Sequence, residues 1–104
     1  MLKKQVQSVR RPLDVHGAFI RRTDLSGTSL RGANLAGADA TNASFRNVDF
    51  DGALLRGTIL RGADLTDAKN LTVDQLSSAI IDDHTILPAH IDRARILEKQ
   101  RATN

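Results

Sequence analysis

The sequence predicts an all-β solenoid, in which the chain winds into stacked coils, and three observations predict it. Large apolar residues recur at every fifth position from Ile20 to Leu65. Glycine, asparagine and aspartate recur with the same spacing, mostly two positions after them. The 104 residues include 3 phenylalanines, no tryptophan, no tyrosine and no cysteine. A layered globular core would therefore be hard to fill, and disulfides and thiolate metal sites are excluded.

The repeat keeps one register over ten consecutive units. Small residues stand two positions before the large ones, so both point to the same side of a short extended segment. The glycine, asparagine and aspartate residues then bend the chain, because they adopt turn geometry and positive φ most readily. The residues expected to point inward are Ile20, Leu25, Leu30, Leu35, Ala40, Phe45, Phe50, Leu55, Leu60 and Leu65.

Neither a helix nor a flat strand keeps a five-residue period on one face. Five residues of α-helix advance about 500°, which leaves the next apolar residue about 140° from the first. On a strand, an odd step places successive residues on opposite faces. The chain must therefore turn once in every unit, and the coils stack about 4.8 Å apart with their backbones paired.

The units "ANLAG", "ADLTD" and "ASFRN" resemble the A(D/N)LXX pattern of the pentapeptide-repeat proteins. The resemblance covers residues 13–72 and implies a right-handed quadrilateral β-helix with four units in each coil. On that geometry the repeat region would hold about 2.5 to 3 coils. The expected organisation is a basic N-terminal arm (1–12), the β-helix (13–72) and a C-terminal capping segment (73–104).

The C-terminal segment should close the solenoid with two short helices. An extra residue moves Leu71 out of register, and Thr72 with Gln75 matches a capping box that opens the first helix. Residues 79–83 look like one more repeat unit, with Ala79 and Ile81 pointing inward. Pro88 suits the first turn of a second helix, about 89–102, which carries an apolar stripe of Ile91, Ala94 and Leu97.

Charge is balanced along the repeat and concentrated in the arm. Residues 1–12 carry Lys3, Lys4, Arg10 and Arg11 without an acid, whereas residues 13–72 have no net charge. The arm lacks aromatic residues for stacking on bases, so nucleic acid is an unlikely partner. No apolar run is long enough for a membrane span or a signal peptide, and a cytoplasmic protein is expected.

The sequence predicts no catalytic, cofactor-binding or metal-binding residues. The imidazoles of His16, His84 and His90 lack metal-ligand spacing. A triad drawn from the short segment 77–84 would need a concave site with oxyanion donors, which a capping helix and a tight loop do not offer. These polar side chains are expected to be solvated turn residues: Ser77, Ser78, Asp82, Asp83 and His84.

On the outside of a four-sided coil, residues 20 apart should stack. This places Arg31 over Asp51 and Asp49 under Lys69, as surface ion pairs worth at most about 1 kcal/mol. Three outward positions carry apolar residues where the resemblance implies polar ones, and they form the candidate partner surface: Phe19, Leu54 and Ile59. Leu54 and Ile59 should meet near one corner. Alternatively, the terminal helix or the arm folds over these residues.

The function expected from these features is that of a non-catalytic scaffold that binds another protein, and the sequence identifies no partner. Self-association through the C-terminal part is known in the family that the chain resembles and is open to this chain. The alternative is a mimic of DNA that binds DNA gyrase, as some pentapeptide-repeat proteins do. A neutral, short solenoid disfavours it, because mimicry requires columns of negative charge.

Ala40 is the lapse in the large apolar column. A buried Leu→Ala gap costs about 2–5 kcal/mol if nothing fills it. Phe45 and Phe50 follow in the same coil, and we expect their rings to compensate for the missing volume.

Overall fold

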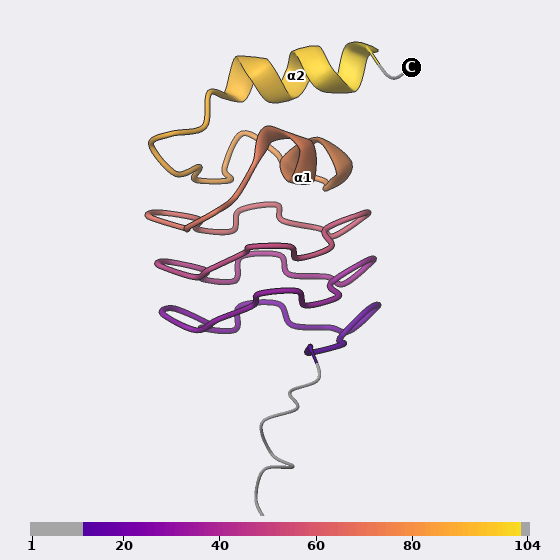
Figure 1. The fold of residues 1–104 in the computed structure, drawn as a ribbon, viewed down its shortest axis with the longest axis vertical. Coiled ribbons are helices and arrows are strands. Elements are labelled where there is room, and N and C mark those ends of the chain that lie inside the picture. The colour runs from indigo at the N-terminus through magenta and orange to yellow at the C-terminus, as the bar shows by residue number, and fades with distance from the viewer. Residues whose placement is uncertain (1–11, 103–104) are drawn as a thin grey trace, which may run out of the picture.

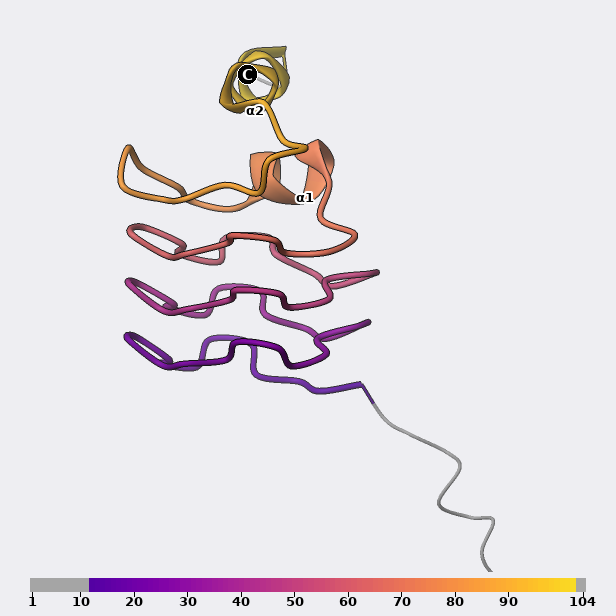
Figure 2. The ribbon, with the colours of Figure 1, turned by 90° about the vertical axis from the view of Figure 1, so that its left-hand side faces the viewer.

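The computed structural model describes residues 12–102, in which the chain winds into flat coils stacked on one another (Figure 1). Two helices, α1 (Val73–Ser78) and α2 (Arg93–Ala102), lie at the C-terminal end of the stack. Figure 2 shows α2 end-on, farther than α1 from the coils along the axis of the stack. The repeat region and the helices are therefore arranged one after the other along one direction.

Parallel backbone bridges between coils form four ladders. We name each ladder by its first residue. The Asp14 ladder continues to Asn34 and Leu54, and the Phe19 ladder continues to Asp39 and Ile59. The Asp24 ladder continues to Ser44 and Asp64, and the Ser29 ladder continues to Asp49 and Lys69. Partners among these ladder residues are 20 residues apart, and neighbouring ladders start five residues apart. Each coil consequently has four sides, with one repeat unit on each side.

The turns between the sides use the left-handed backbone region that the sequence pattern predicts. Besides the glycines, φ is positive at Arg22 (57°), Asn42 (60°), Asn47 (62°) and Asp67 (58°). At Gly62, whose φ is 66°, an added Cβ would also clash with the Asn42 side-chain oxygen. The column two positions after the large apolar residues is therefore a column of bends.

The large apolar column forms the core. Its eight members from Leu30 to Leu65 are at most 4% exposed, and Ile20 and Leu25, in the first coil, are partly buried against them. The small column adds buried alanines and Thr58, whose hydroxyl donates to the Leu35 carbonyl at 2.7 Å. The hydroxyl of Thr58, although buried in this thin core, therefore has a hydrogen-bond partner.

Ala40 has no exposed surface, and two aromatic rings lie in the same coil. The centroids of Phe45 and Phe50 are 5.5 Å apart and their planes are tilted by 51°, a favourable aromatic arrangement. Both rings are also fully buried. A small residue at position 40 is consistent with a coil whose interior is filled by two phenylalanines.

Ala40→Leu is expected to lower the free energy of unfolding by about 1–3 kcal/mol, because the added carbons overfill a closed coil. Urea denaturation of the wild type and the variant measures the difference. Ala94→Leu on the exposed face of α2 is the control, with an expected change within about 0.5 kcal/mol. A rise in the stability of Ala40→Leu would show instead that an empty space lies beside Ala40.

Helix α1 begins with the predicted capping box. The Gln75 N–H donates to the Thr72 hydroxyl at 3.1 Å, and the Thr72 N–H donates to the Gln75 side-chain oxygen at 2.9 Å. Leu76 is fully buried and joins the core. The Gln75 amide also donates to the carbonyls of Phe50 and Ala53, at 2.9 and 3.0 Å. One side chain thus starts the helix and attaches it to the coil beneath.

After α1 the chain returns to the solenoid. Ile80 extends the Phe19 ladder by pairing with Ile59, with Ala79 buried and Ile81 partly buried, as predicted for residues 79–83. A second unit was not predicted: Ile86 extends the Asp24 ladder by pairing with Asp64, and Thr85 takes the small inward position. The hydroxyl of Thr85 donates to the Leu60 carbonyl at 2.7 Å.

The prediction for the second helix was wrong in its start and in its buried face. Residues 89–90 form a turn and Pro88 precedes it, because residues 84–88 are occupied by the additional unit. Helix α2 begins at Arg93, after the Asp92 side chain accepts from the Ala94 N–H at 2.9 Å. Ile96 is fully buried, whereas Ala94 and Leu97 of the predicted stripe are exposed.

Polar side chains join α2 and the preceding turn to backbone carbonyls of the last coil. The Arg93 guanidinium donates to the carbonyls of Asp82, at 2.9 Å, and Thr85, at 2.5 Å. A ring nitrogen of His90 lies 2.9 Å from the Leu71 carbonyl. These contacts satisfy backbone groups that the end of a solenoid would otherwise expose. Within residues 12–102, neither helix is long and apolar enough to cross a membrane.

Candidate functional site

The structure places two of the three candidate partner residues on the Phe19 ladder. Phe19 is 86% exposed and Ile59 is partly exposed, with Asp39 between them. Ile80 continues the same ladder and is 38% exposed. The side of the solenoid that carries this ladder therefore presents three outward apolar residues and one carboxylate.

The outward position in each unit has a structural role that the sequence analysis missed. Where it is Asp or Asn, its side-chain oxygen accepts from the backbone N–H two residues later. The Ser26 N–H donates to Asp24 and the Ala36 N–H donates to Asn34, each at 3.0 Å. This bond fixes the turn that follows. The fixed step of three residues from each Asp or Asn to the bend was the available signal. The same bond recurs at Asp14, Asp39, Asp49 and Asp64.

An apolar side chain at this position gives up that hydrogen bond and exposes carbon to water. Phe19, Leu54 and Ile59 all occupy it. Neither consequence favours folding, so these residues are poorly explained by the stability of the coil. This exception to a bonding pattern distinguishes the candidate surface more sharply than exposure alone.

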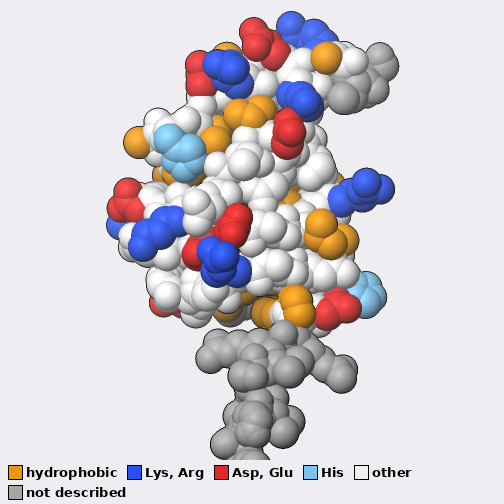
Figure 3. Space-filling view, in the orientation of Figure 1, with side chains coloured by type: hydrophobic (Ala, Val, Ile, Leu, Met, Phe, Trp, Pro, Cys, Tyr) orange, Lys and Arg blue, Asp and Glu red, His pale blue; other side chains and the backbone are white. Residues whose placement is uncertain are grey.

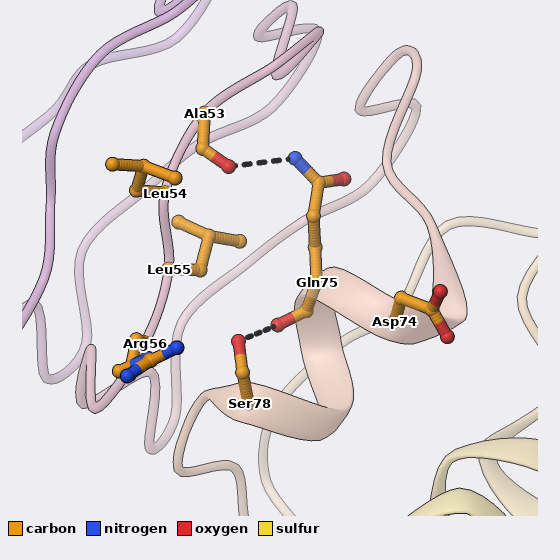
Figure 4. Close-up of a pocket in the computed structure, with 7 residues that line it drawn as sticks. All are labelled: Ala53, Leu54, Leu55, Arg56, Asp74, Gln75 and Ser78. Atoms are coloured by element: carbon orange, nitrogen blue, oxygen red, sulfur yellow. Dashed lines mark hydrogen bonds between the residues drawn. The ribbon is translucent and has the colours of Figure 1, made fainter.

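Leu54 lies on the neighbouring side, on the segment that runs past α1 (Figure 4). It is 56% exposed and lines a hollow of about 260 Å³ together with Gln75 and Ser78 of α1. Leu54 and Ile59 therefore stand on two adjacent ladders, with the Arg56–Gly57 turn between them. The two residues thus stand on either side of one turn, and of the two only Leu54 lines the hollow beside α1.

The charged side chains of the other sides are largely paired with one another. Arg31 lies 3.0 Å from Asp51, as predicted, and 3.3 Å from Asp49. The predicted Asp49–Lys69 pair is replaced: the two residues pair through their backbones, but the carboxylate accepts from Arg31 and from the Asn70 amide at 2.9 Å. Figure 3 shows acidic and basic side chains lying close together on one face, with hydrophobic side chains in several separate groups.

The polar residues of the segment 77–84 take part in local structure. Asp82 accepts from the backbone N–H groups of Gly62 and His84, each at 3.0 Å, and the Gly62 bond is the main cause of the lowered pKa of Asp82. The hydroxyls of Ser77 and Ser78 donate to backbone carbonyls within α1. Among residues 12–102, no group of three His, Asp or Glu side chains could hold a metal ion.

Acidification is expected to destabilise the protein. Hydrogen bonds from the hydroxyl and the N–H of Thr41 hold the pKa of Asp39 below its ordinary value of 3.8, and the pKa is lowered in the same direction at Asp14, Asp24, Asp49, Asp64 and Asp82. A carboxyl with a lower pKa in the folded state stabilises that state above its unfolded pKa. That contribution is lost as the pH falls through the folded pKa.

The melting temperature should therefore be steady above about pH 5 and should fall below about pH 4, where these carboxylates take up protons. Thermal unfolding at a series of pH values and constant ionic strength measures this dependence. A melting temperature that stays constant down to about pH 2.5 would show that the turn bonds do not favour the charged carboxylates.

Four parallel ladders closed into a coil by five-residue units define a class of protein, the quadrilateral β-helix. The model of the family described as pentapeptide repeats matches the chain in eight copies, over residues 20–57 and 33–69. The chain belongs to the pentapeptide-repeat family, and its structural relatives imply that the β-helix is right-handed. No catalytic family is indicated. No match was found among curated proteins.

The solved structures that resemble the chain are pentapeptide repeat proteins. Rfr23 from the cyanobacterium Cyanothece 51142 is 30% identical, with a TM-score of 0.65 over 74% of this chain and 52% of that one. The chain thus spans about half the length of Rfr23. A protein from Nostoc Pcc 7120 is 28% identical, with a TM-score of 0.38 over 80% of this chain and 72% of that one. A protein of the Arabidopsis thaliana thylakoid lumen is 22% identical, with a TM-score of 0.27 over 79% and 63%.

Proposed function

We propose that this protein is a non-catalytic scaffold that binds another protein through outward apolar residues of its solenoid. The observation that carries the proposal is the set of three apolar residues, Phe19, Leu54 and Ile59, at a position where Asp or Asn fixes the following turn in six other units. A rigid coil displays such residues with little loss of conformational freedom on binding.

The architecture that supports this role is a solenoid of about 2.5 to 3 coils, closed at its C-terminal end by a helical cap. The bonds from Gln75 and Arg93 to backbone carbonyls support the cap, as do the buried Leu76 and Ile96. In this proposal the cap prevents end-to-end pairing and leaves the sides available for a partner.

An affinity capture from a lysate of the source cells tests the function, with the wild type compared with the double variant Leu54→Asp plus Ile59→Asp. Proteins that bind through these residues should be retained by the wild type and lost from the variant. Ser29→Asp plus Ser44→Asp is the matched control, because it adds two carboxylates at outward positions of the other two ladders. Equal capture by all three proteins would contradict the proposed surface.

A gyrase assay separates the scaffold from the gyrase-binding alternative. The charges of the repeat cancel, and Arg31 and Arg46 stand on its outside within 3.3 Å of carboxylates. We therefore expect no inhibition of DNA supercoiling by gyrase when the protein is added. Inhibition would overturn the scaffold function, because it would identify the enzyme as the target.

A further inference from the structure

The side of the solenoid that carries the Phe19 ladder combines exposed apolar residues with arginines that lack an acidic partner. We call this side the Phe19 face. It comprises the Phe19 ladder up to Ile80, the turns at 16–17, 36–37 and 56–57 that precede the ladder, and the turns at 21–22, 41–42, 61–62 and 83–84 that follow it. The last of these turns contains Asp83, and Asp82 beside it is bonded to the Gly62 N–H. The two features can be compared with the other sides residue by residue.

The arginines on the other sides are neutralised within the solenoid. Arg31 lies 3.3 Å from Asp49 and 3.0 Å from Asp51, and Arg46 lies 3.0 Å from Asp64. Both arginines are held in ion pairs, so neither is free to bind a carboxylate of a partner.

The arginines that border the Phe19 face differ. Within the part of the chain that the structure describes, Arg22, Arg56 and Arg61 form no ion pair, and all three are exposed. Arg21 has only a long contact, 3.8 Å, with Asp39. Lys69 also lacks an ion pair in this part of the chain, but it belongs to the Ser29 ladder on the opposite side. The unpaired positive charge of the coils is therefore concentrated around one apolar ladder.

We propose that the Phe19 face binds an acidic protein segment that carries apolar side chains. This inference rests on the proposed scaffold function and specifies the chemistry of the partner. The arginines at the turns would bind carboxylates, for which the guanidinium geometry is suited. Apolar side chains of the segment would pack on Phe19, Ile59 and Ile80 between them. Exposed aromatic and arginine residues are the types enriched where protein interfaces gain most of their affinity.

The composition of the face favours a protein segment over nucleic acid. Ile59 and Ile80 offer aliphatic contacts, and Phe19 is the one aromatic ring on the face available for stacking on a base. Coils about 4.8 Å apart place Phe19 and Ile59 about 10 Å from each other, within reach of two apolar side chains of one extended segment.

Fluorescence anisotropy with defined probes tests the proposal. The main probe is a labelled peptide of alternating Glu and Leu. Two matched peptides carry Lys in place of Glu or Ser in place of Leu, and labelled oligothymidylate represents nucleic acid. We expect the Glu–Leu peptide to bind the full chain about tenfold more tightly than the matched peptides or the oligonucleotide, with affinity that falls as salt is raised.

Variants locate the binding on the chain. Arg22→Asn plus Arg61→Thr removes two unpaired charges and uses residues that the same turns already contain at Asn42 and Thr41. Arg31→Thr plus Arg46→Thr removes two paired charges from the other sides and is matched in net charge. We expect the first pair and Phe19→Ser each to weaken binding of the Glu–Leu peptide about tenfold, and the second pair to leave it nearly unchanged.

Each result supports or overturns the proposal. Absence of binding by the Glu–Leu peptide overturns it, as does equal weakening by both arginine pairs, which would indicate an effect of net charge alone. Tighter binding of oligothymidylate than of the peptide would identify nucleic acid as the partner. If a cellular partner is lost with Leu54→Asp plus Ile59→Asp while the peptide fails to bind, the scaffold function stands and only the acidic partner is wrong.

Discussion

Phe45→Ala is expected to lower the free energy of unfolding by about 3–5 kcal/mol, the largest loss from a single substitution in this chain. Phe45 is fully buried and its ring lies 5.5 Å from that of Phe50, so the substitution removes both buried area and an aromatic contact. The coil is closed by backbone bonds to the coils on either side, as at Phe45 to Asp64 and Ser44 to Thr23. It therefore cannot collapse readily around the cavity.

The loss is measured by urea denaturation monitored by circular dichroism. Phe19→Ala is the matched control, because Phe19 is 86% exposed and its truncation should change stability by no more than about 0.5 kcal/mol. Equal losses in the two variants would contradict the burial of Phe45. A small loss in Phe45→Ala alone would mean that the coil relaxes into the cavity.

The second large effect is expected from Ile96→Ala, which should cost about 2–5 kcal/mol. Ile96 is fully buried and belongs to the same apolar cluster as Leu76 of α1. The substitution weakens the attachment of α2 to the rest of the protein, and with it the bonds from Arg93 to the Asp82 and Thr85 carbonyls. Amide hydrogen exchange should become faster in residues 79–92 before it becomes faster in the earlier coils.

The neighbouring residue provides the control for this prediction. Leu97 is 48% exposed, so Leu97→Ala should cost clearly less than Ile96→Ala. If Leu97→Ala cost more stability than Ile96→Ala, the buried face of α2 would be the apolar stripe predicted from the sequence. The helix would then have to be rotated about its axis.

The coils could be predicted because one physical constraint repeats along the chain. A small residue, a large apolar residue and a bend recur every five positions, and each repetition narrows the choice of structure. The inward column therefore followed from its spacing, and Ala40 is buried in it like its larger neighbours. The Thr72–Gln75 capping box was also predictable, because both of its bonds are local.

The C-terminal segment shows where local patterns stop being informative. Ile91, Ala94 and Leu97 have helical spacing, yet the buried residue is Ile96, because the direction of α2 depends on its contacts with the coils and α1. Gln75 and Arg93 bond to carbonyls 22 to 25 residues and 8 to 11 residues away, respectively. Such contacts depend on the folded stack and have no signature in the neighbouring residues.

The sequence showed which residues make up the candidate surface, but not that Leu54 belongs to a different side of the solenoid from Phe19 and Ile59. Phe19, Leu54 and Ile59 are conspicuous because they break a polar column. Only the ladder pairs show that Ile80 extends the line of Phe19 and Ile59, and that Leu54 belongs to another ladder, beside a hollow that α1 lines. Pairing of charges is likewise a property of the folded sides, since Arg31 and Arg61 have similar sequence surroundings, yet of the two only Arg31 forms ion pairs within residues 12–102.

The four ladders also make the orientation of the two ends depend on the number of repeat units between them. Removal of 20 residues, one full circuit of the ladders, would shorten the stack and leave α1 and α2 above the same sides as before. Removal of a single five-residue unit would turn the whole C-terminal segment by a quarter of a circle relative to the first coil. Ile80 would then follow another ladder, and the line from Phe19 would be broken. A change in length can thus alter which surfaces face the same direction without altering any residue on them.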